Sequence, residues 1–237
     1  MAVQDYFSYL LNPLELLRTK KVLQVNPTVV SQRAEPVETK LTVYDYNTDR
    51  LDIKALTKVA DCFPYIDPQT VSWINVDGLR KDDVEAICKH FGVHYLITED
   101  ILSLGQRPKM DEIDGLLFCL LNMLYFNDKD SAVEIEQISI VLGKNFVISF
   151  QEDATRDVFN PLRERLKVGT TKVRQNGADF LFYALIDMIV DNYYVVMEKL
   201  GEKIEGLEED IVRNANTRSL AKINMLRKEM IILKRSV

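Results

Sequence analysis

The sequence predicts an α+β fold in α/β/α layers, with a mostly antiparallel sheet flanked by helices and followed by a long C-terminal helical hairpin. Two observations predict it. Between residues 41 and 150, short segments rich in β-branched and aromatic residues alternate apolar with polar side chains, which is the pattern of half-buried strands. From Ala178 onward no proline occurs and helix-forming residues dominate, which predicts long helices.

The first half of the predicted domain contains two strands and two helices. Leu41–Tyr46 and Val71–Val76 show the strand alternation. Residues 80–91 carry apolar side chains at helical spacing among charges, and Gly92 follows where a helical C-cap is expected. A second short helix is predicted over 97–104.

Three further strands are predicted in the middle of the chain. Leu116–Tyr125, Glu134–Leu142 and Asn145–Phe150 are strand-like, and Gly143-Lys144 is a tight-turn candidate between the last two. Pairing in sequence order makes the sheet largely antiparallel. Pro161 begins a short helix, because proline is well tolerated in the first turn.

The last helices are predicted to fold back on each other. Residues 199–210 are rich in acids, whereas 213–235 hold seven bases and the single acid Glu229. A break at 214–217 permits a hairpin with opposite charges facing; two separately solvated faces are the alternative. An apolar stripe continues to Val237 with no stop signal, so we expect the intact protein to continue. The stripe consists of Leu220, Ile223, Leu226, Met230, Leu233 and Val237.

These segments divide the chain into three parts: an N-terminal arm (1–37), an α/β/α domain (38–174) and long helices (175–237). The net charge of −6 offers no basic field, so we expect no nucleic-acid partner. The longest apolar run, Leu116–Phe126, is shorter than the ~20 residues of a membrane helix. We therefore expect membrane contact only through a segment beyond Val237.

The cysteines and histidines give little support for catalysis or for zinc. Cys62, Cys88 and Cys119 lie far apart, which predicts buried packing thiols rather than disulfides. His90 and His94 are four residues apart, but the helix end at Gly92 separates their faces, so zinc is the minor alternative. No phosphate loop, nucleophile elbow or metalloprotease box occurs, so we expect no enzyme.

Carboxylates are the more informative metal-ligand candidates, since Mg²⁺ prefers oxygen ligands. Glu99 and Asp100 lie at the predicted start of a helix, where a capping function is the simpler explanation. Asp187 lies in an apolar helical segment and needs a cation, a donor or water. Asp191 follows one turn later on the same face and is the weaker candidate; an ordinary polar helix face is the alternative.

Several long segments together resemble the CorA family of cation transporters. The first is SWINVDGLRKDDVEAICKHFGVHYLITEDILSLGQRPK, with its W-I-N, F-G-V-H and E-D-I-L motifs. EIEQISIVLGKNFVISFQE, DVFNPLRERLK and GADFLFYALIDMIVDNYYVVMEKLGEKIEGLEED follow in the family's order and spacing. The resemblance covers roughly residues 38–237 and leaves out the arm.

The resemblance implies a cytosolic regulatory domain on the cytoplasmic side of the inner membrane, preceding a stalk and two membrane helices that this sequence lacks. It further implies a homopentamer held closed by Mg²⁺, or by Co²⁺ or Ni²⁺, bound between neighbouring subunits. The family's metal site matches Glu99, Asp100 and Asp187, with another acid beyond Val237. With that incomplete ligand set, the isolated chain is expected to bind metal weakly, and it need not form the pentamer: a monomer is an alternative for the isolated domain.

Two other readings share many of these features. The cytosolic domain of a ZntB-like zinc transporter would have the same fold and Zn²⁺ in place of Mg²⁺. A free-standing soluble module that binds metal or a protein partner would use the acidic and basic helices for docking, but the unfinished final helix argues against it.

Overall fold

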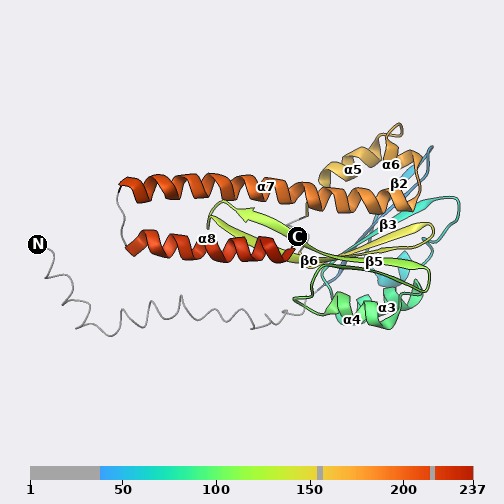
Figure 1. Ribbon diagram of the computed structural model, residues 1–237. Helices are drawn as coiled ribbons and strands as arrows, with labels where there is room; N and C mark the ends of the chain where they lie inside the picture. Colours follow the sequence, from blue (N-terminus) through green and yellow to red (C-terminus); the bar gives the residue numbers. More distant parts are fainter. Residues whose placement is uncertain (1–37, 154–156, 214–216, 237) are drawn as a thin grey trace, which may run out of the picture. The chain divides into compact units, whose positions relative to one another are not determined.

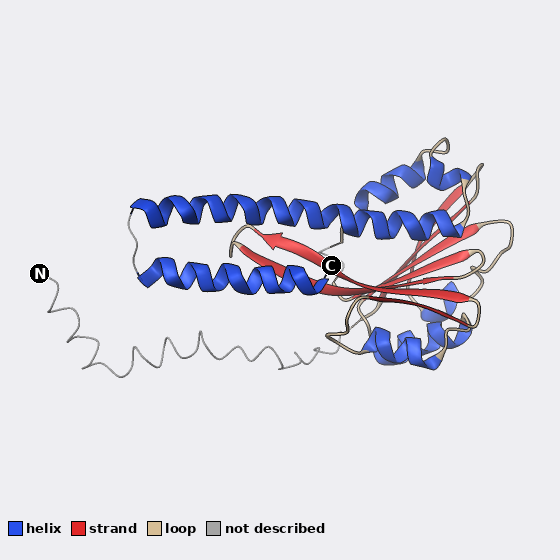
Figure 2. Cartoon of the chain, viewed as in Figure 1, coloured by secondary structure: helices blue, strands red, loops and turns tan. Residues whose placement is uncertain are grey.

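The computed structural model describes residues 38–153, 157–213 and 217–236, all within one compact unit, Ala34–Val237. The predicted arm, residues 1–37, and the last stripe position, Val237, lie outside the described residues. Figures 1 and 2 show a single sheet between two layers of helices. The predicted α+β layers are therefore confirmed.

The sheet has seven strands in the order β2-β1-β3-β7-β6-β5-β4. Its neighbours pair antiparallel except β3 and β7, which are parallel. The prediction of a largely antiparallel sheet is thus confirmed, while strict pairing in sequence order fails at β3. The strands are β1 Lys40–Tyr46, β2 Leu51–Leu56, β3 Val71–Asp77, β4 Lys109–Ile113, β5 Leu116–Asn127, β6 Ala132–Leu142 and β7 Phe146–Gln151.

Each face of the sheet is covered by its own group of helices. The 3₁₀ turn η1 and helices α3 and α4 cover one face, and α5 to α8 cover the other, as Figure 1 shows for α3, α4, α5 and α7. The bounds are η1 Val59–Cys62, α3 Lys81–His90, α4 Tyr95–Leu102, α5 Asn160–Lys167, α6 Lys172–Gln175, α7 Ala178–Arg213 and α8 Thr217–Ser236.

The strand alternation produces two hydrophobic cores, because successive side chains point to opposite faces. In β3, Trp73 is fully buried against α5 and α7, and Ile74 is fully buried against α3 and α4. The three cysteines are buried and unpaired, as predicted. Burial raises the pKa of the Cys62 thiol to about 12 and that of Cys88 and of Cys119 to about 11, so all three stay protonated at neutral pH.

The end of α3 agrees with the glycine signal, but α4 does not begin where the sequence predicted. Gly92 has a φ of +71° just after α3, and the N–H of Val93 bonds the carbonyl of Cys88 at 2.8 Å. In contrast, α4 begins at Tyr95, two residues earlier than predicted, because His94 caps it: the His94 Nδ1 accepts the Leu96 N–H at 3.3 Å. This shift changes the setting of the candidate acids.

Helices α7 and α8 form the predicted hairpin. Lys203 of α7 contacts both carboxylate oxygens of Glu229 in α8 at 2.7 Å, and Lys222 contacts Asp210 at 2.6 Å. Of the predicted apolar stripe on α8, Leu226 and Leu233 adjoin the core. The other described positions of the stripe, Leu220, Ile223 and Met230, are exposed.

Helix α7 is also long and apolar enough, over Ala178–Val212, to cross a membrane by length and composition. The prediction of no such helix rested on continuous apolar runs and therefore did not find α7, because acidic residues interrupt the apolar residues of this helix. In this fold, buried residues of α7 such as Leu185, Ile189 and Val196 form the core with the sheet. A buried core helix of a folded domain satisfies the same length and composition test.

The turn between β6 and β7 leaves no room for a side chain at Gly143. A Cβ atom placed there would lie 2.3–2.4 Å from the Phe146 ring, which is almost completely buried. We expect Gly143→Ala to destabilise the protein by about 1–3 kcal/mol, because the ring must leave its core position. Urea denaturation measures this. Gly206→Ala is the matched control. Gly206 is an exposed residue of α7, and a Cβ atom placed there would have no other atom within 4 Å. We therefore expect this variant to gain about 0.5–1 kcal/mol of stability, because alanine favours a helix more than glycine does.

Candidate metal site

The acids of α4 lie in the second half of the helix rather than at its start. Glu99 is exposed and Asp100 is half-buried, and α4 ends at Leu102. Carboxylates near a helix C-terminus are disfavoured by the helix dipole, so the capping explanation for this pair is wrong. Their position therefore requires another reason, or at least a compensating cation.

Lys109 supplies that cation for Asp100. Its ammonium lies 2.5 Å from the Asp100 carboxylate and 3.4 Å from Asp111. The Asp100 hydrogen bond raises the pKa of Lys109 despite partial desolvation. The side-chain amide of Gln137 in β6 fixes the end of α4, because it donates hydrogen bonds to the backbone carbonyls of Asp100 and Ser103 at 3.2 and 2.8 Å. Asp100 is thus held in place, with a side chain that already binds one positive group.

The acids of α7 lie on a solvent-facing part of that helix. Asp187 is half-buried and accepts a hydrogen bond from the Tyr183 hydroxyl at 3.3 Å, which meets the expectation that it needs a donor. Asp191 is exposed one turn later. Asp187 lies at helical spacing from Tyr183 and Val190, and Asp191 lies at helical spacing from Tyr194; all three of these neighbours are exposed large hydrophobic residues.

Within one chain these two groups of acids do not meet. Helix α4 packs on one face of the sheet and α7 on the other, so the sheet separates Glu99 and Asp100 from Asp187. Among the described residues, no three His, Cys, Asp or Glu side chains are grouped so as to hold a metal ion. The candidate ligands can share an ion only if a second copy brings them together.

The minor zinc alternative is weakened by the geometry of the histidines. His90 stacks on Phe63 with ring centroids 4.0 Å apart, and its Nε2 lies 3.0 Å from the Phe63 carbonyl. His94 is occupied as the cap of α4. Cys88 is buried, and burial raises the pKa of its thiol, which disfavours the thiolate that zinc requires.

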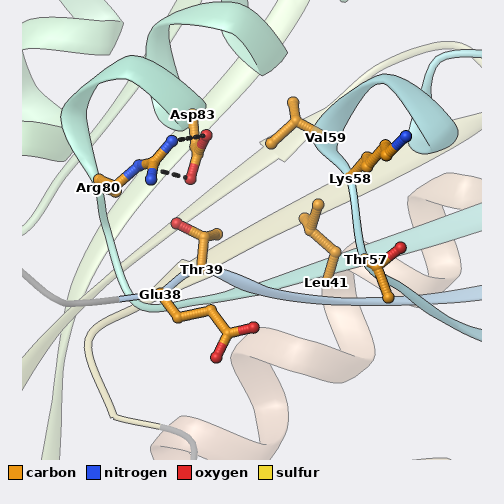
Figure 3. Close-up of a pocket in the computed structure, with 8 residues that line it drawn as sticks. All are labelled: Glu38, Thr39, Leu41, Thr57, Lys58, Val59, Arg80 and Asp83. Atoms are coloured by element: carbon orange, nitrogen blue, oxygen red, sulfur yellow. Dashed lines mark hydrogen bonds and ion pairs between the residues drawn. The ribbon is translucent and has the colours of Figure 1, made fainter.

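A hollow near the start of β1 offers no better cation site (Figure 3). It has a volume of about 300 Å³ and contains two acids, Glu38 and Asp83. Asp83 is engaged by the guanidinium of Arg80, with two N···O contacts of 3.1 Å. Figure 3 shows the Glu38 carboxylate pointing away from that pair. Only one carboxylate is therefore available there, and the lining also includes the positively charged Lys58.

One feature of the candidate site was missed by sequence reasoning: both groups of acids adjoin exposed apolar side chains. On α4, Tyr95 is 70% exposed and Leu96 is 46% exposed, one turn before Glu99. On α7, Tyr194 is 65% exposed beside Asp191. Clusters of exposed aromatic and aliphatic residues mark surfaces that contact other molecules. Helical spacing around each acid was the signal available in the sequence.

Comparison with known proteins gives consistent matches. A family model described as CorA-like Mg²⁺ transporter protein matches residues 68–237. The cobalt/magnesium transport protein CorA of Thermotoga maritima is 33% identical over 199 residues, which are 84% of this chain and 56% of that protein. The complete structure of the CorA magnesium transporter from Methanocaldococcus jannaschii matches with a TM-score of 0.62 and 16% identity, covering 85% of this chain and 59% of that one.

The ZntB cytoplasmic domain from Vibrio parahaemolyticus is similar to nearly the same degree. Its TM-score is 0.59 at 16% identity, over 82% of this chain and 74% of that one. At such identities the structural matches show the fold alone, so they do not separate magnesium from zinc transporters. Whether the site suits Mg²⁺ or Zn²⁺ therefore has to be judged from the side chains that the structure describes.

These matches define the class as divalent-cation transporters, and the curated relatives are named as transporters rather than enzymes. The chain belongs to the CorA-like Mg²⁺ transporter family, which confirms the resemblance seen in the sequence. It spans about half the length of the two curated relatives that match it over the longest stretches. The transport activity of the whole relatives is therefore not carried over by the match alone.

Proposed function

We propose that this chain is the cytoplasmic metal-sensing domain of a CorA-like transporter, in which Mg²⁺ bound between neighbouring copies stabilises a closed homopentamer. One observation supports this above the others. The candidate ligands Glu99 and Asp100 on α4 and Asp187 on α7 lie on opposite faces of the sheet, each group beside exposed apolar side chains. This is the arrangement needed for α4 of one copy to contact α7 of the next.

Such a contact would make metal and assembly depend on each other. Carboxylates brought together across an interface repel, and a divalent cation reverses the sign of that interaction. Exposed Tyr95 and Leu96 on one copy and Tyr183, Val190 and Tyr194 on the other supply apolar area around the ion. An ion that binds only the closed assembly stabilises it by mass action, so closure follows the cytoplasmic Mg²⁺ concentration.

Lys109 has a defined place in this proposal. Its ammonium forms an ion pair with the Asp100 carboxylate at 2.5 Å. Mg²⁺ must displace Lys109 or share Asp100 with it, so Lys109 weakens Mg²⁺ binding at this site. The midpoint of the response is then shifted to a higher Mg²⁺ concentration.

The test is the effect of Mg²⁺ and of Co²⁺ on melting temperature and on sedimentation of the 237-residue chain. We expect both ions to raise the melting temperature and to favour assembly, and Asp100→Ala and Asp187→Ala to abolish both effects. Glu112→Ala is the control, because Glu112 is an exposed acid of β4 outside the proposed contact. If all variants respond to Mg²⁺ like the wild type, the site lies elsewhere; a response to Zn²⁺ alone would favour the zinc-transporter alternative.

Replacing Lys109 should act in the opposite direction. We expect Lys109→Met to tighten Mg²⁺ binding roughly two- to fivefold, since a partly exposed ion pair of this kind contributes up to about 1 kcal/mol. The same titration of melting temperature measures the change. Weaker Mg²⁺ binding in this variant would contradict the competing role of Lys109.

A further inference from the structure

Helix α7 begins at one end of the sheet (Figure 1). A second hollow, lined in part by the first residue of α7, takes no part in the proposed metal site. It has a volume of about 400 Å³, within the range of small-ligand sites. Four separate segments line it, from the end of β1 to the first residue of α7. The lining residues are Tyr46, Asn47, Thr48, Pro68, Gln69, Thr70, Val71, Lys144, Asn145, Arg174, Gln175, Asn176, Gly177 and Ala178.

The charge of this hollow is opposite to that of the protein. The chain carries a net charge of −6, yet the lining contains two cations, Lys144 and Arg174, and no carboxylate. Arg174 is only 4% exposed, and its guanidinium donates to three backbone carbonyls, those of Asn47, Leu166 and Thr48. Among the described ion pairs none neutralises this buried charge, and a buried charge is costly unless it is paired.

The beginning of α7 adds donors to the same hollow. The first hydrogen bond of this 36-residue helix runs from the Leu181 N–H to the Gly177 carbonyl, so the preceding N–H groups have no acceptor within the helix. Gly177 and Ala178 line the hollow. Backbone N–H groups at a helix N-terminus, together with the helix dipole, favour a bound anion.

Independent of the helix terminus, two buried hydroxyl groups on the hollow have no partner. Tyr46 is 0% exposed and Thr70 is 4% exposed, and the hydroxyl oxygen of each is buried without a hydrogen bond. A buried hydroxyl without a hydrogen-bond partner costs free energy. A ligand that accepts a hydrogen bond from this hydroxyl recovers that free energy. Burial raises the pKa of Tyr46, so its hydroxyl keeps the proton that it would donate. Buried polar groups without partners in a cationic hollow indicate that an acceptor is missing.

We propose that this hollow binds a phosphate group, either inorganic phosphate or the phosphate of a nucleotide, through Lys144, Arg174, the start of α7 and the hydroxyls of Tyr46 and Thr70. An oxyanion with several acceptor oxygens matches this set of donors, and its charge neutralises Arg174. One group opposes binding: Asp179, an exposed acid in the first turn of α7 that acts electrostatically on Tyr46. Removing its charge should therefore strengthen binding.

The test is calorimetric titration of the full 237-residue chain with inorganic phosphate and with AMP, at constant ionic strength in chloride. We expect both to bind, with AMP tighter if the site takes an ester and no tighter if it takes free phosphate. Tyr46→Phe and Lys144→Gln should weaken binding roughly tenfold, as expected for loss of a hydrogen bond to a charged group. Asp179→Asn should tighten it.

Two comparisons keep the result unambiguous. Tyr46→Phe removes an unpaired hydroxyl, so its melting temperature in chloride should stay equal to that of the wild type or rise, which separates lost binding from lost folding. Lys89→Gln, on α3 at the other face of the sheet, carries the same charge change as Lys144→Gln and should leave phosphate binding intact. The proposal is overturned if neither ligand binds, or if Lys89→Gln weakens binding as much as Lys144→Gln.

Discussion

Replacing Arg163 with leucine is expected to destabilise the protein by about 3–5 kcal/mol, the cost of removing one partner from a buried ion pair. Arg163 of α5 pairs with Asp157; their side chains are 16% and 7% exposed. The guanidinium also lies over the rings of Trp73 and Tyr44, 5.3 and 6.0 Å from their centroids. Its loss removes a cation–π contact and leaves the buried carboxylate without its cation.

Asp157 cannot relax easily after this loss, because it also accepts hydrogen bonds from the Phe159 N–H at 2.6 Å and the Gln151 side chain at 3.0 Å. The pair therefore joins α5 to the end of β7. Urea denaturation measures the change in the free energy of unfolding.

Arg165→Leu is the matched control for this variant, since Arg165 is an exposed arginine on the same helix, and we expect a change within about 0.5 kcal/mol. The double variant Asp157→Asn with Arg163→Leu should lose less stability than the sum of the losses of the two single variants, because no unpaired buried charge remains in it. Equal losses for Arg163→Leu and Arg165→Leu would show that the pair contributes nothing beyond an ordinary surface arginine.

The central strands and the hairpin were predictable because their signals are local. β3 and β7 are rich in apolar β-branched residues such as Ile74 and Ile148, and Gly143 marks the turn before β7. The parallel pairing of β3 with β7 left no such signal, since it joins Ser72 to Phe146 across more than seventy intervening residues. It depends on the packing of both faces of the sheet rather than on any turn.

Both edge strands were missed for a physical reason. β2 and β4 each have one neighbour and expose much of their length, so both are short and carry charged residues: Asp52 and Lys54 in β2, and Lys109, Asp111 and Glu112 in β4. A usable signal did exist for β4: Asp114 and Gly115 have φ values of 54° and 79°, and Asp-Gly is a favoured hairpin turn. The sequence pattern alone thus carried the connection from β4 to β5.

The candidate acids were identifiable singly, but their surroundings were not. Family resemblance and apolar context selected Asp100 and Asp187, whereas the contact of Asp100 with Lys109 depends on how α4 packs above the edge of the sheet. The start of α4 was displaced because a histidine cap carries no strong sequence signal. The hollow proposed to bind phosphate was undetectable from the sequence, because four separate segments form it.

The hairpin should depend just as strongly on Glu229, a residue that is 5% exposed on α8. Lys203 of α7 contacts both of its carboxylate oxygens at 2.7 Å and also donates to the Ser131 carbonyl between β5 and β6. One ammonium group therefore joins α7, α8 and the long central hairpin of the sheet. Glu229→Ala removes the main partner of that ammonium, and we expect a loss of about 3–5 kcal/mol.

Helix α8 should detach first in this variant, because its remaining contacts with the core are limited to partly buried residues such as Leu226 and Leu233. Hydrogen exchange should accordingly accelerate in α8 while the sheet stays protected. Lys222→Ala is the matched control: it breaks a second ion pair between the same two helices, that of Lys222 with Asp210. These two side chains are 58% and 54% exposed, so the loss should cost at most about 1 kcal/mol. If the two variants cost the same, burial adds nothing to the Lys203–Glu229 pair, and the hairpin is held by its apolar contacts alone.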